Sequence, residues 1–167
     1  NDVSGKCVLE CRGMDGKLRN RFPGLRSCEA LTVSRDGRRC AVIIDRQSIV
    51  AVDVAMMKYV REFKDIGRIR GMLGFSNDAE HLWAGLESGT VVFAAVTTGA
   101  ISSSITGHTA PVYGDWDDGG VLVLVDRNGT VSVWDGTGSR PEFWFDEGGG
   151  RGDGIVRIVD NGKRFVV

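Results

Sequence analysis

The apolar positions of the chain alternate with polar ones instead of recurring every three or four residues. Alternation is clear over residues 48–53 and 130–134, and residues 122–125 form a continuous apolar run. Alternation has the period of a half-buried β-strand, and a short apolar run fits a strand buried on both faces. Asn-Gly and Asp-Gly pairs, which favour the positive φ angles of tight hairpins, close these runs. The pattern predicts an all-β fold.

Two landmarks return along the chain with the same spacing. A polar turn before an apolar strand is centred on positions 36, 78, 118 and 161, with steps of 42, 40 and 43 residues. The start of a later strand recurs at positions 48, 89 and 129, with steps of 41 and 40 residues. A period of about 40–45 residues with four strands per unit is typical of a propeller blade. The repeats therefore predict a β-propeller of four-stranded antiparallel blades.

The residues between about 28 and 135 resemble the WD-repeat family of β-propellers. Gly107-His108 is followed by Trp134-Asp135, and a Ser-x-Asp-Gly turn covers residues 34–37. The resemblance implies structural roles for His108, Trp134 and Asp135, and partners that dock on the loop-bearing faces of the propeller.

Many members of that family bond a buried His, Ser or Thr, Asp and Trp within one blade. Here His108 and Trp134 fill two of those places, whereas the hydroxyl position corresponds to Leu124 or Asp126 and Asn128 stands where Asp is usual. We therefore expect the network to be incomplete, with apolar packing holding the blade together.

The domain organisation follows from the period. The chain forms a single propeller unit over residues 1–167, and it is divided as follows: 1–11 as the outer strand of a preceding blade, 12–26 as an inserted loop outside any sheet, 27–66, 67–106 and 107–147 as three blades, and 148–167 as the inner strands of a following blade. We expect a section of a larger propeller that another segment or chain completes, because the chain lacks an initiator Met and stops inside an apolar strand. The alternative is a small closed ring in which the two terminal pieces share a fourth blade.

Charge is balanced over the whole chain and uneven along it. The 167 residues include 21 Lys and Arg and 22 Asp and Glu, a balance that excludes a uniformly basic nucleic-acid binder. Residues 12–39 hold eight basic and three acidic side chains, and residues 107–153 hold nine acidic and three basic ones. Regions of opposite sign suit the steering of protein partners.

The candidate partner-binding residues follow from this charge pattern. Arg19, Arg21 and Arg26 belong to the predicted inserted loop, and we expect Asp115 and Asp117 near the opposite face. Trp144 lies in an outer strand, where an exposed indole would suit a protein contact.

Catalytic and metal-binding signals are weak. His81 and His108 are the only histidines, and neither has a neighbour with metal or nucleophile spacing. The four cysteines cluster near the start without a Cys-x-x-Cys spacing, which favours free thiols in a reducing, intracellular compartment, cytoplasmic or nuclear. No apolar run reaches the length of a membrane span. We expect no cofactor, no bound metal and no enzymatic activity.

These observations predict a non-catalytic protein-interaction scaffold in a multiprotein complex, with proteins or peptides as partners. The alternative is the propeller portion of an RNA-associated factor, or of an enzyme whose chemistry lies elsewhere or in the acidic turn of Asp115 and Asp117.

Overall fold

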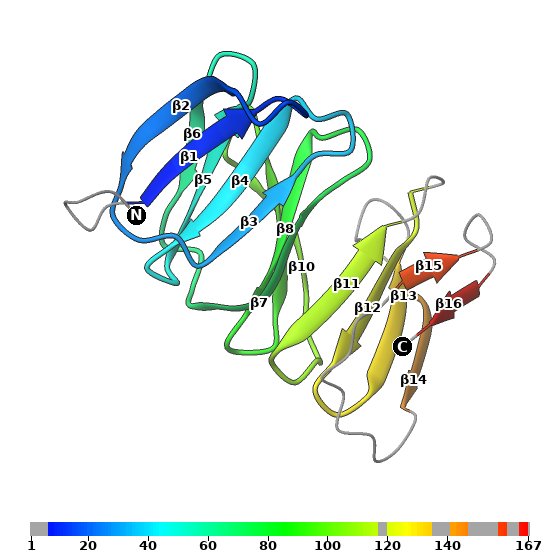
Figure 1. The fold of residues 1–167 in the computed structure, drawn as a ribbon. Coiled ribbons are helices and arrows are strands. Elements are labelled where there is room, and N and C mark those ends of the chain that lie inside the picture. Colours follow the sequence, from blue (N-terminus) through cyan, green and yellow to red (C-terminus); the bar gives the residue numbers. More distant parts are fainter. Residues whose placement is uncertain (1–6, 117–119, 135–140, 147–156, 160–163, 167) are drawn as a thin grey trace.

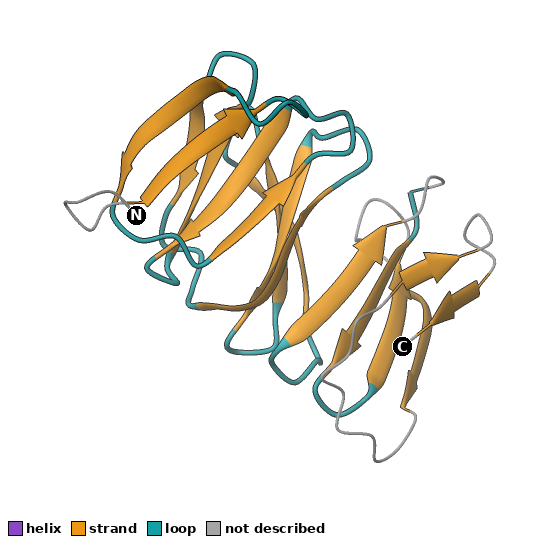
Figure 2. Cartoon of the chain, viewed as in Figure 1, coloured by secondary structure: helices purple, strands orange, loops and turns teal. Residues whose placement is uncertain are grey.

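The computed structural model describes residues 7–116, 120–134, 141–146, 157–159 and 164–166. All regular elements in these ranges are strands, joined by turns at the ends of the sheets (Figure 2). The predicted all-β class is confirmed for this part of the chain. Within the same ranges there is no helix with the length and apolar character needed to cross a membrane.

The first two strands form a separate hairpin. It consists of β1 (Cys7–Arg12) and β2 (Leu18–Leu25), paired antiparallel. The prediction that residues 12–26 form a loop outside any sheet is therefore wrong. The Gly and Pro content suggested a loop, but Phe22 and Leu25 pack against the neighbouring sheet, and their burial outweighs the local turn signals.

The next twelve strands form three four-stranded antiparallel meanders. Their bounds lie close to the strands predicted from the repeats: β3 (Ala30–Val33), β4 (Arg39–Ile44), β5 (Ser48–Asp53) and β6 (Lys58–Phe63); β7 (Ile69–Phe75), β8 (His81–Leu86), β9 (Val91–Ala95) and β10 (Ile101–Ile105); β11 (Val112–Trp116), β12 (Leu122–Asp126), β13 (Thr130–Trp134) and β14 (Pro141–Asp146). Within each meander, strands that are consecutive in the chain are paired. A last antiparallel pair is formed by β15 (Arg157–Val159) and β16 (Arg164–Val166).

The first strands of successive meanders are neighbours. β3 contacts β7, β7 pairs with β11, and β11 contacts β15 (Figure 1). The β7–β11 pair is parallel and joins two meanders into one eight-stranded sheet through Val112 and Gly71. A Cβ at Gly71 would lie 2.6 Å from the carbonyl oxygen of Val112, so the close approach requires glycine at this position.

Alternation along each strand divides its residues between two apolar layers. In β4, Ala41 and Ile43 pack toward the β7–β10 sheet, whereas Cys40 and Val42 pack toward the β1–β2 hairpin. In β12, Leu122 and Leu124 face the β7–β10 sheet, whereas the intervening valines belong to a layer on the other face. The central strands are therefore buried on both faces, which explains their nearly continuous apolar sequences.

Candidate functional site

The predicted basic residues lie on the β1–β2 hairpin and just after it. Arg19 and Arg21 belong to β2, and Arg26 follows the end of that strand. Six residues lie between Arg19 and Arg26, and a regular strand of that length spans about 23 Å. The structure therefore does not bring the three arginines together at one place.

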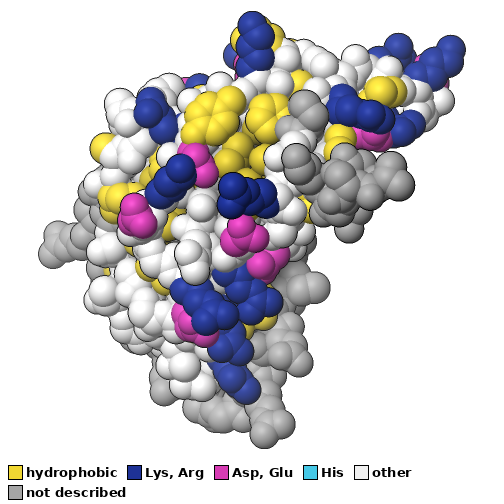
Figure 3. Space-filling view, turned by 90° about the vertical axis from the view of Figure 1, so that its left-hand side faces the viewer, with side chains coloured by type: hydrophobic (Ala, Val, Ile, Leu, Met, Phe, Trp, Pro, Cys, Tyr) yellow, Lys and Arg dark blue, Asp and Glu magenta, His cyan; other side chains and the backbone are white. Residues whose placement is uncertain are grey.

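Nearby carboxylates already pair with two of these arginines. Arg19 Nη2 lies 3.0 Å from Asp15 Oδ2, and Arg21 Nη2 lies 2.6 Å from Glu10 Oε1. Glu10 also bonds Arg12, and the hydrogen bonds from both guanidinium groups lower the pKa of its carboxyl. Basic and acidic side chains are likewise interspersed on the face drawn in Figure 3. The excess of positive charge counted along the sequence is thus partly neutralised within the hairpin.

Arg26 is the predicted basic residue with a groove beside it. It is exposed and lines a groove of about 540 Å³ between β2 and the β3–β6 sheet. Phe22, Ile44 and Tyr59 form part of the same lining. An apolar wall next to a cation is compatible with a contact to an acidic or amphipathic partner surface.

Asp115 lines a second cavity, of about 320 Å³, at one end of the first strands β3, β7 and β11. The lining includes Val33 and Met72, two residues that are 51% and 36% exposed. The turn after β3 contributes Arg35 to the lining. Asp117 and Asp135 lie outside the described residues, as does the side chain of Trp144, so the structure does not describe the predicted acidic pair.

The predicted opposition of basic and acidic regions is wrong for Arg19 and Asp115. Next to Arg19, the Nδ2 of Asn20 donates a hydrogen bond to the carbonyl of Ala55, in the turn between β5 and β6. That turn is linked to the turn after β3 by the Val54 N–H, which donates to the Arg38 carbonyl. Because the turn after β3 also lines the Asp115 cavity, both residues lie toward the same end of the strands.

Two tryptophans shape this cavity. Trp83 of β8 pairs across the sheet with Gly74 of β7, and its indole lies where a Cβ of Gly74 would be. The far edge of the same ring approaches Gly114 of β11, where a Cβ would lie 3.0 Å from Trp83 Cη2. Trp116, at the end of β11, completes this wall. The two glycines thus create the space that the Trp83 ring fills.

A buried polar network lies at the start of the third meander. His108 Nε2 lies 2.7 Å from Ser132 Oγ, and Trp134 Nε1 donates to the same oxygen at 2.6 Å. Asp126 Oδ2 lies 3.7 Å from His108 Nδ1 and accepts the Thr109 N–H at 2.7 Å. Burial lowers the pKa of His108, and the nearby Asp126 carboxylate partly opposes this effect. The ring is therefore neutral at pH 7, with its proton on Nδ1 facing Asp126 and with Nε2 accepting from Ser132.

The positions expected for the hydroxyl and the carboxylate are wrong, and the 3.7 Å separation of His108 Nδ1 and Asp126 Oδ2 is longer than a hydrogen bond. The hydroxyl comes from Ser132, two residues before Trp134 on the same face of β13, and the carboxylate comes from Asp126 at the end of β12. Residues i and i+2 of a strand point the same way, so the position of Ser132 could have been found from Trp134. Asp126 additionally accepts the N–H groups of Asn128 and Thr130 in the following turn.

Asp126, His108 and Ser132 are also the three residue types of a catalytic Asp-His-Ser triad. In this chain the Ser132 residue is 0% exposed and its oxygen already accepts the Trp134 N–H. The side chains of His108 and Asp126 are 0% and 1% exposed. A substrate carbonyl cannot reach this serine in the described structure, and the buried hydrogen bonds of the network stabilise the fold.

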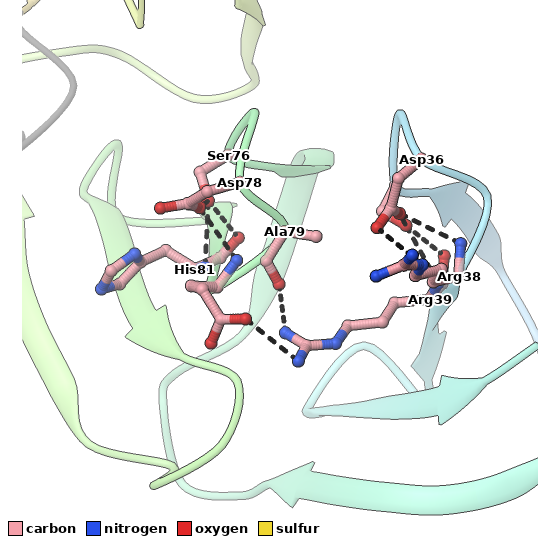
Figure 4. A network of polar contacts seen from close by, with 9 residues as sticks. Asp36, Arg38, Arg39, Ser76, Asp78, Ala79 and His81 are labelled. Atoms are coloured by element: carbon pink, nitrogen blue, oxygen red, sulfur yellow. Dashed lines mark hydrogen bonds and ion pairs between the residues drawn. The ribbon is translucent and has the colours of Figure 1, made fainter.

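The first two meanders each contain the same Ser-Asp turn between their first and second strands (Figure 4). Ser34 Oγ donates to Asp36 Oδ1 at 2.6 Å, and 42 residues later Ser76 Oγ donates to Asp78 Oδ1 at 2.5 Å. These hydrogen bonds are the main cause of the lowered pKa of both aspartates. Arg39, which follows the first turn, reaches the second turn and donates to the Ala79 carbonyl. Arg39 therefore joins the turn after β3 to the turn after β7.

The cysteines lie around one apolar layer between the hairpin and the β3–β6 sheet. Cys7, Cys28 and Cys40 belong to this layer, and none of the three forms a disulfide. Burial raises the pKa of Cys28 to about 12, and a hydrogen bond with Cys7 adds to the effect. A thiol with a raised pKa is a poor nucleophile and a poor metal ligand at neutral pH. Over the described ranges, no three His, Cys, Asp or Glu side chains gather in a way that could hold a metal ion.

Comparison of the sequence with known protein families gives no match, and no curated protein matches it either.

Proposed function

We propose that the chain is a section of a WD-repeat-like β-propeller that acts as a non-catalytic protein-interaction scaffold in a multiprotein complex. Each four-stranded meander corresponds to one blade, with its first strand next to the first strand of the following blade. The linked His108, Ser132, Trp134 and Asp126 side chains support the family resemblance, because they are the four residue types that the family bonds within one blade.

The exposed apolar rim of the Asp115 cavity carries the functional part of the proposal. Val33 and Met72 are exposed there beside polar and charged side chains. Apolar side chains ringed by polar ones are typical of protein-binding surfaces. The site lies at the junction of three repeats, where a partner can contact several of them at once.

Incomplete cover of β3 supports completion by another segment or chain. Leu31 and Val33 pair across the sheet with the buried residues Val42 and Cys40, so all four lie on one face. The hairpin packs on the part of that face formed by β4 and β5, whereas Leu31 and Val33 remain 56% and 51% exposed. A further pair of strands on this face would bury them.

Affinity capture with matched surface variants tests the scaffold proposal. The wild type, a Met72→Glu variant and a Met14→Glu control would be compared by quantitative mass spectrometry. Met14 is fully exposed in the β1–β2 turn, away from the cavity lining. We expect the wild type and the control to retain the same specific partners and the Met72→Glu variant to lose them. Equal recovery by all three proteins, or no specific partner for the wild type, would overturn the proposal.

A further inference from the structure

The two ends of the molecule carry complementary halves of a four-stranded meander. The fourth strand of one meander leads directly into the first strand of the next, as β6 leads into β7 and β10 into β11. The pair β1–β2 leads into β3 in the same way, so these two strands correspond to a third and a fourth strand. At the other end, β15 contacts β11 as β11 contacts β7, so β15 and β16 correspond to a first and a second strand.

The face of β3 shows what is missing at the first of these ends. Leu31 and Val33 correspond to Leu73 and Phe75 of β7, which lie 42 residues later and have partners on the second strand that are also 42 residues later. Leu73 and Phe75 are 6% and 8% exposed, because they share an apolar cluster with the β3–β6 sheet. Leu31 and Val33 are 56% and 51% exposed, although the β1–β2 hairpin covers the adjoining β4 and β5. The uncovered area is therefore the place of a first and a second strand.

The strand edges at the two ends match as well. Among the described strands, β1 pairs only with β2, and β16 pairs only with β15. An edge without a partner strand can accept one from another chain. Figure 1 places the β1–β2 hairpin and the β15–β16 pair at opposite ends of the molecule, so the two halves do not meet within one copy.

We propose that the β15–β16 pair of a second copy of this chain joins the edge of β1 and covers Leu31 and Val33, completing a four-stranded blade. The new contact between β16 and β1 would repeat the pairing of second and third strands seen between β4 and β5. The inference rests on the propeller interpretation in the proposed function, and it names the chain that completes the propeller.

The same contact made twice closes a ring of two copies. The contact joins two different surfaces, so it is heterologous and can form either a ring or an open filament. The sixteen strands in the described part of the chain equal four blades of four strands. Two copies would therefore form a ring of eight blades, within the usual range of about four to eight.

The first test is the mass in solution, measured by analytical ultracentrifugation over a range of concentrations. The wild type would be compared with Leu31→Glu and with Ile101→Glu, a control for an aliphatic residue that is 49% exposed on β10, outside the proposed contact. We expect the wild type and the control to have twice the 18.1 kDa mass of one copy. Leu31→Glu should raise the dissociation constant at least about tenfold, because the contact would bury an unpaired charge. Since Leu31 is exposed in the single copy, this variant keeps its core, which thermal unfolding at a dilute, monomeric concentration verifies.

Hydrogen exchange then locates the contact. At a concentration where the wild type is a dimer, we expect the backbone amides of β1 and β16 to exchange more slowly than in Leu31→Glu, whereas those of β10 should be unchanged. A single copy at every concentration, larger open assemblies, a dimer equally stable in Leu31→Glu, or protection confined to other strands would overturn the inference. Partner capture that depends on Met72 in a protein that stays a monomer would leave the scaffold proposal intact.

Discussion

His108 and Ser132 are 24 residues apart in sequence, and they join the segment before β11 to the third strand of the same meander through a 2.7 Å contact. The Ser132 hydroxyl accepts from Trp134 and donates to His108, so one oxygen serves two buried neighbours. Its removal leaves two polar groups without their shared partner.

We therefore expect Ser132→Ala to lower the free energy of unfolding by about 1–3 kcal/mol. Urea denaturation followed by circular dichroism measures the change. Ser104→Ala is the matched control, because Ser104 is an exposed strand serine and its loss should stay within about 0.5 kcal/mol. Equal midpoints for the two variants would contradict a stabilising role for the network.

The same network predicts a pH dependence of stability. Burial lowers the pKa of His108 in the folded protein below its ordinary value of 6.5. As the pH falls through 6.5 the unfolded chain takes up this proton first, so the unfolded state is favoured and stability decreases. The contribution is complete above pH 6.5 and declines between that pH and the folded pKa, by at most about 1.4 kcal/mol per pH unit.

Urea denaturation at several values between pH 5 and pH 8 measures this slope. The His108→Gln variant lacks the titrating group and should have a flatter profile over the same interval, although it is less stable at pH 7. An equally steep decline in that variant would assign the effect to other groups.

Two glycines with similar backbone angles should respond very differently to alanine. Gly37 and Gly89 have φ values of 70° and 84°, a region that disfavours any other residue. A Cβ at Gly37 meets open space, whereas a Cβ at Gly89 would overlap the carbonyl of His108. Gly89 thus lets the β8–β9 turn lie against the junction before β11.

We expect Gly37→Ala to cost about 1 kcal/mol, the backbone penalty alone. Gly89→Ala should cost at least about 3 kcal/mol, because backbone must also move and the His108 network lies next to it. Thermal unfolding of both variants measures the difference. Similar losses would mean that the turn and the junction can separate without disturbing the fold.

The strands of the three meanders could be predicted from sequence because two-residue alternation or a short continuous apolar run is bounded by turn signals. Asp36-Gly37 and Asn128-Gly129 are such signals, and both glycines have positive φ. The β1–β2 hairpin could not be predicted in the same way. Its burial depends on contacts with Val42 and Val50, which lie much later in the chain.

The candidate site was only partly predictable. Asp115 was identified from charge, but the cavity around it depends on three strands from different repeats. Trp83 and Trp116 were not predicted to line this cavity, because in the sequence both fit equally well as core residues. The position of the Trp83 ring can be recognised only once Gly74 and Gly114 are placed beside it.

The confinement of Trp83 leads to a further prediction. Gly74→Ala places a methyl group where the indole lies, and the rigid ring cannot fold away from it. We expect a loss of about 1–3 kcal/mol, typical of overpacking. Gly74→Ala combined with Trp83→Leu should lose less than the sum of the two single variants, because the smaller side chain leaves room for the methyl group. Additive losses in chemical denaturation would contradict the packing described for this wall.

Arg39 links two repeats through an ion pair and a hydrogen bond, and the contributions of the two to stability can be measured separately. Its Nη2 lies 3.1 Å from Glu80 Oε1, and its Nη1 donates to the Ala79 carbonyl (Figure 4). The Arg39 side chain is 21% exposed and that of Glu80 is 48% exposed, so solvent weakens the ion pair. Exposed pairs contribute about 0–1 kcal/mol, whereas a hydrogen bond from a charged group to a shielded carbonyl contributes more.

We accordingly expect Glu80→Gln to change stability by less than about 0.5 kcal/mol and Arg39→Met to cost about 1–2 kcal/mol. Methionine retains the apolar stem, so the loss in Arg39→Met reports on the guanidinium and not on packing. A double-mutant cycle of the two substitutions in urea denaturation isolates the ion pair, and its coupling energy should be small and should decrease further in 0.5 M NaCl. A large, salt-insensitive coupling would instead place the stabilisation in the Arg39–Glu80 pair. Equal small effects of both variants would mean that the bond to Ala79 adds nothing to the contact between repeats.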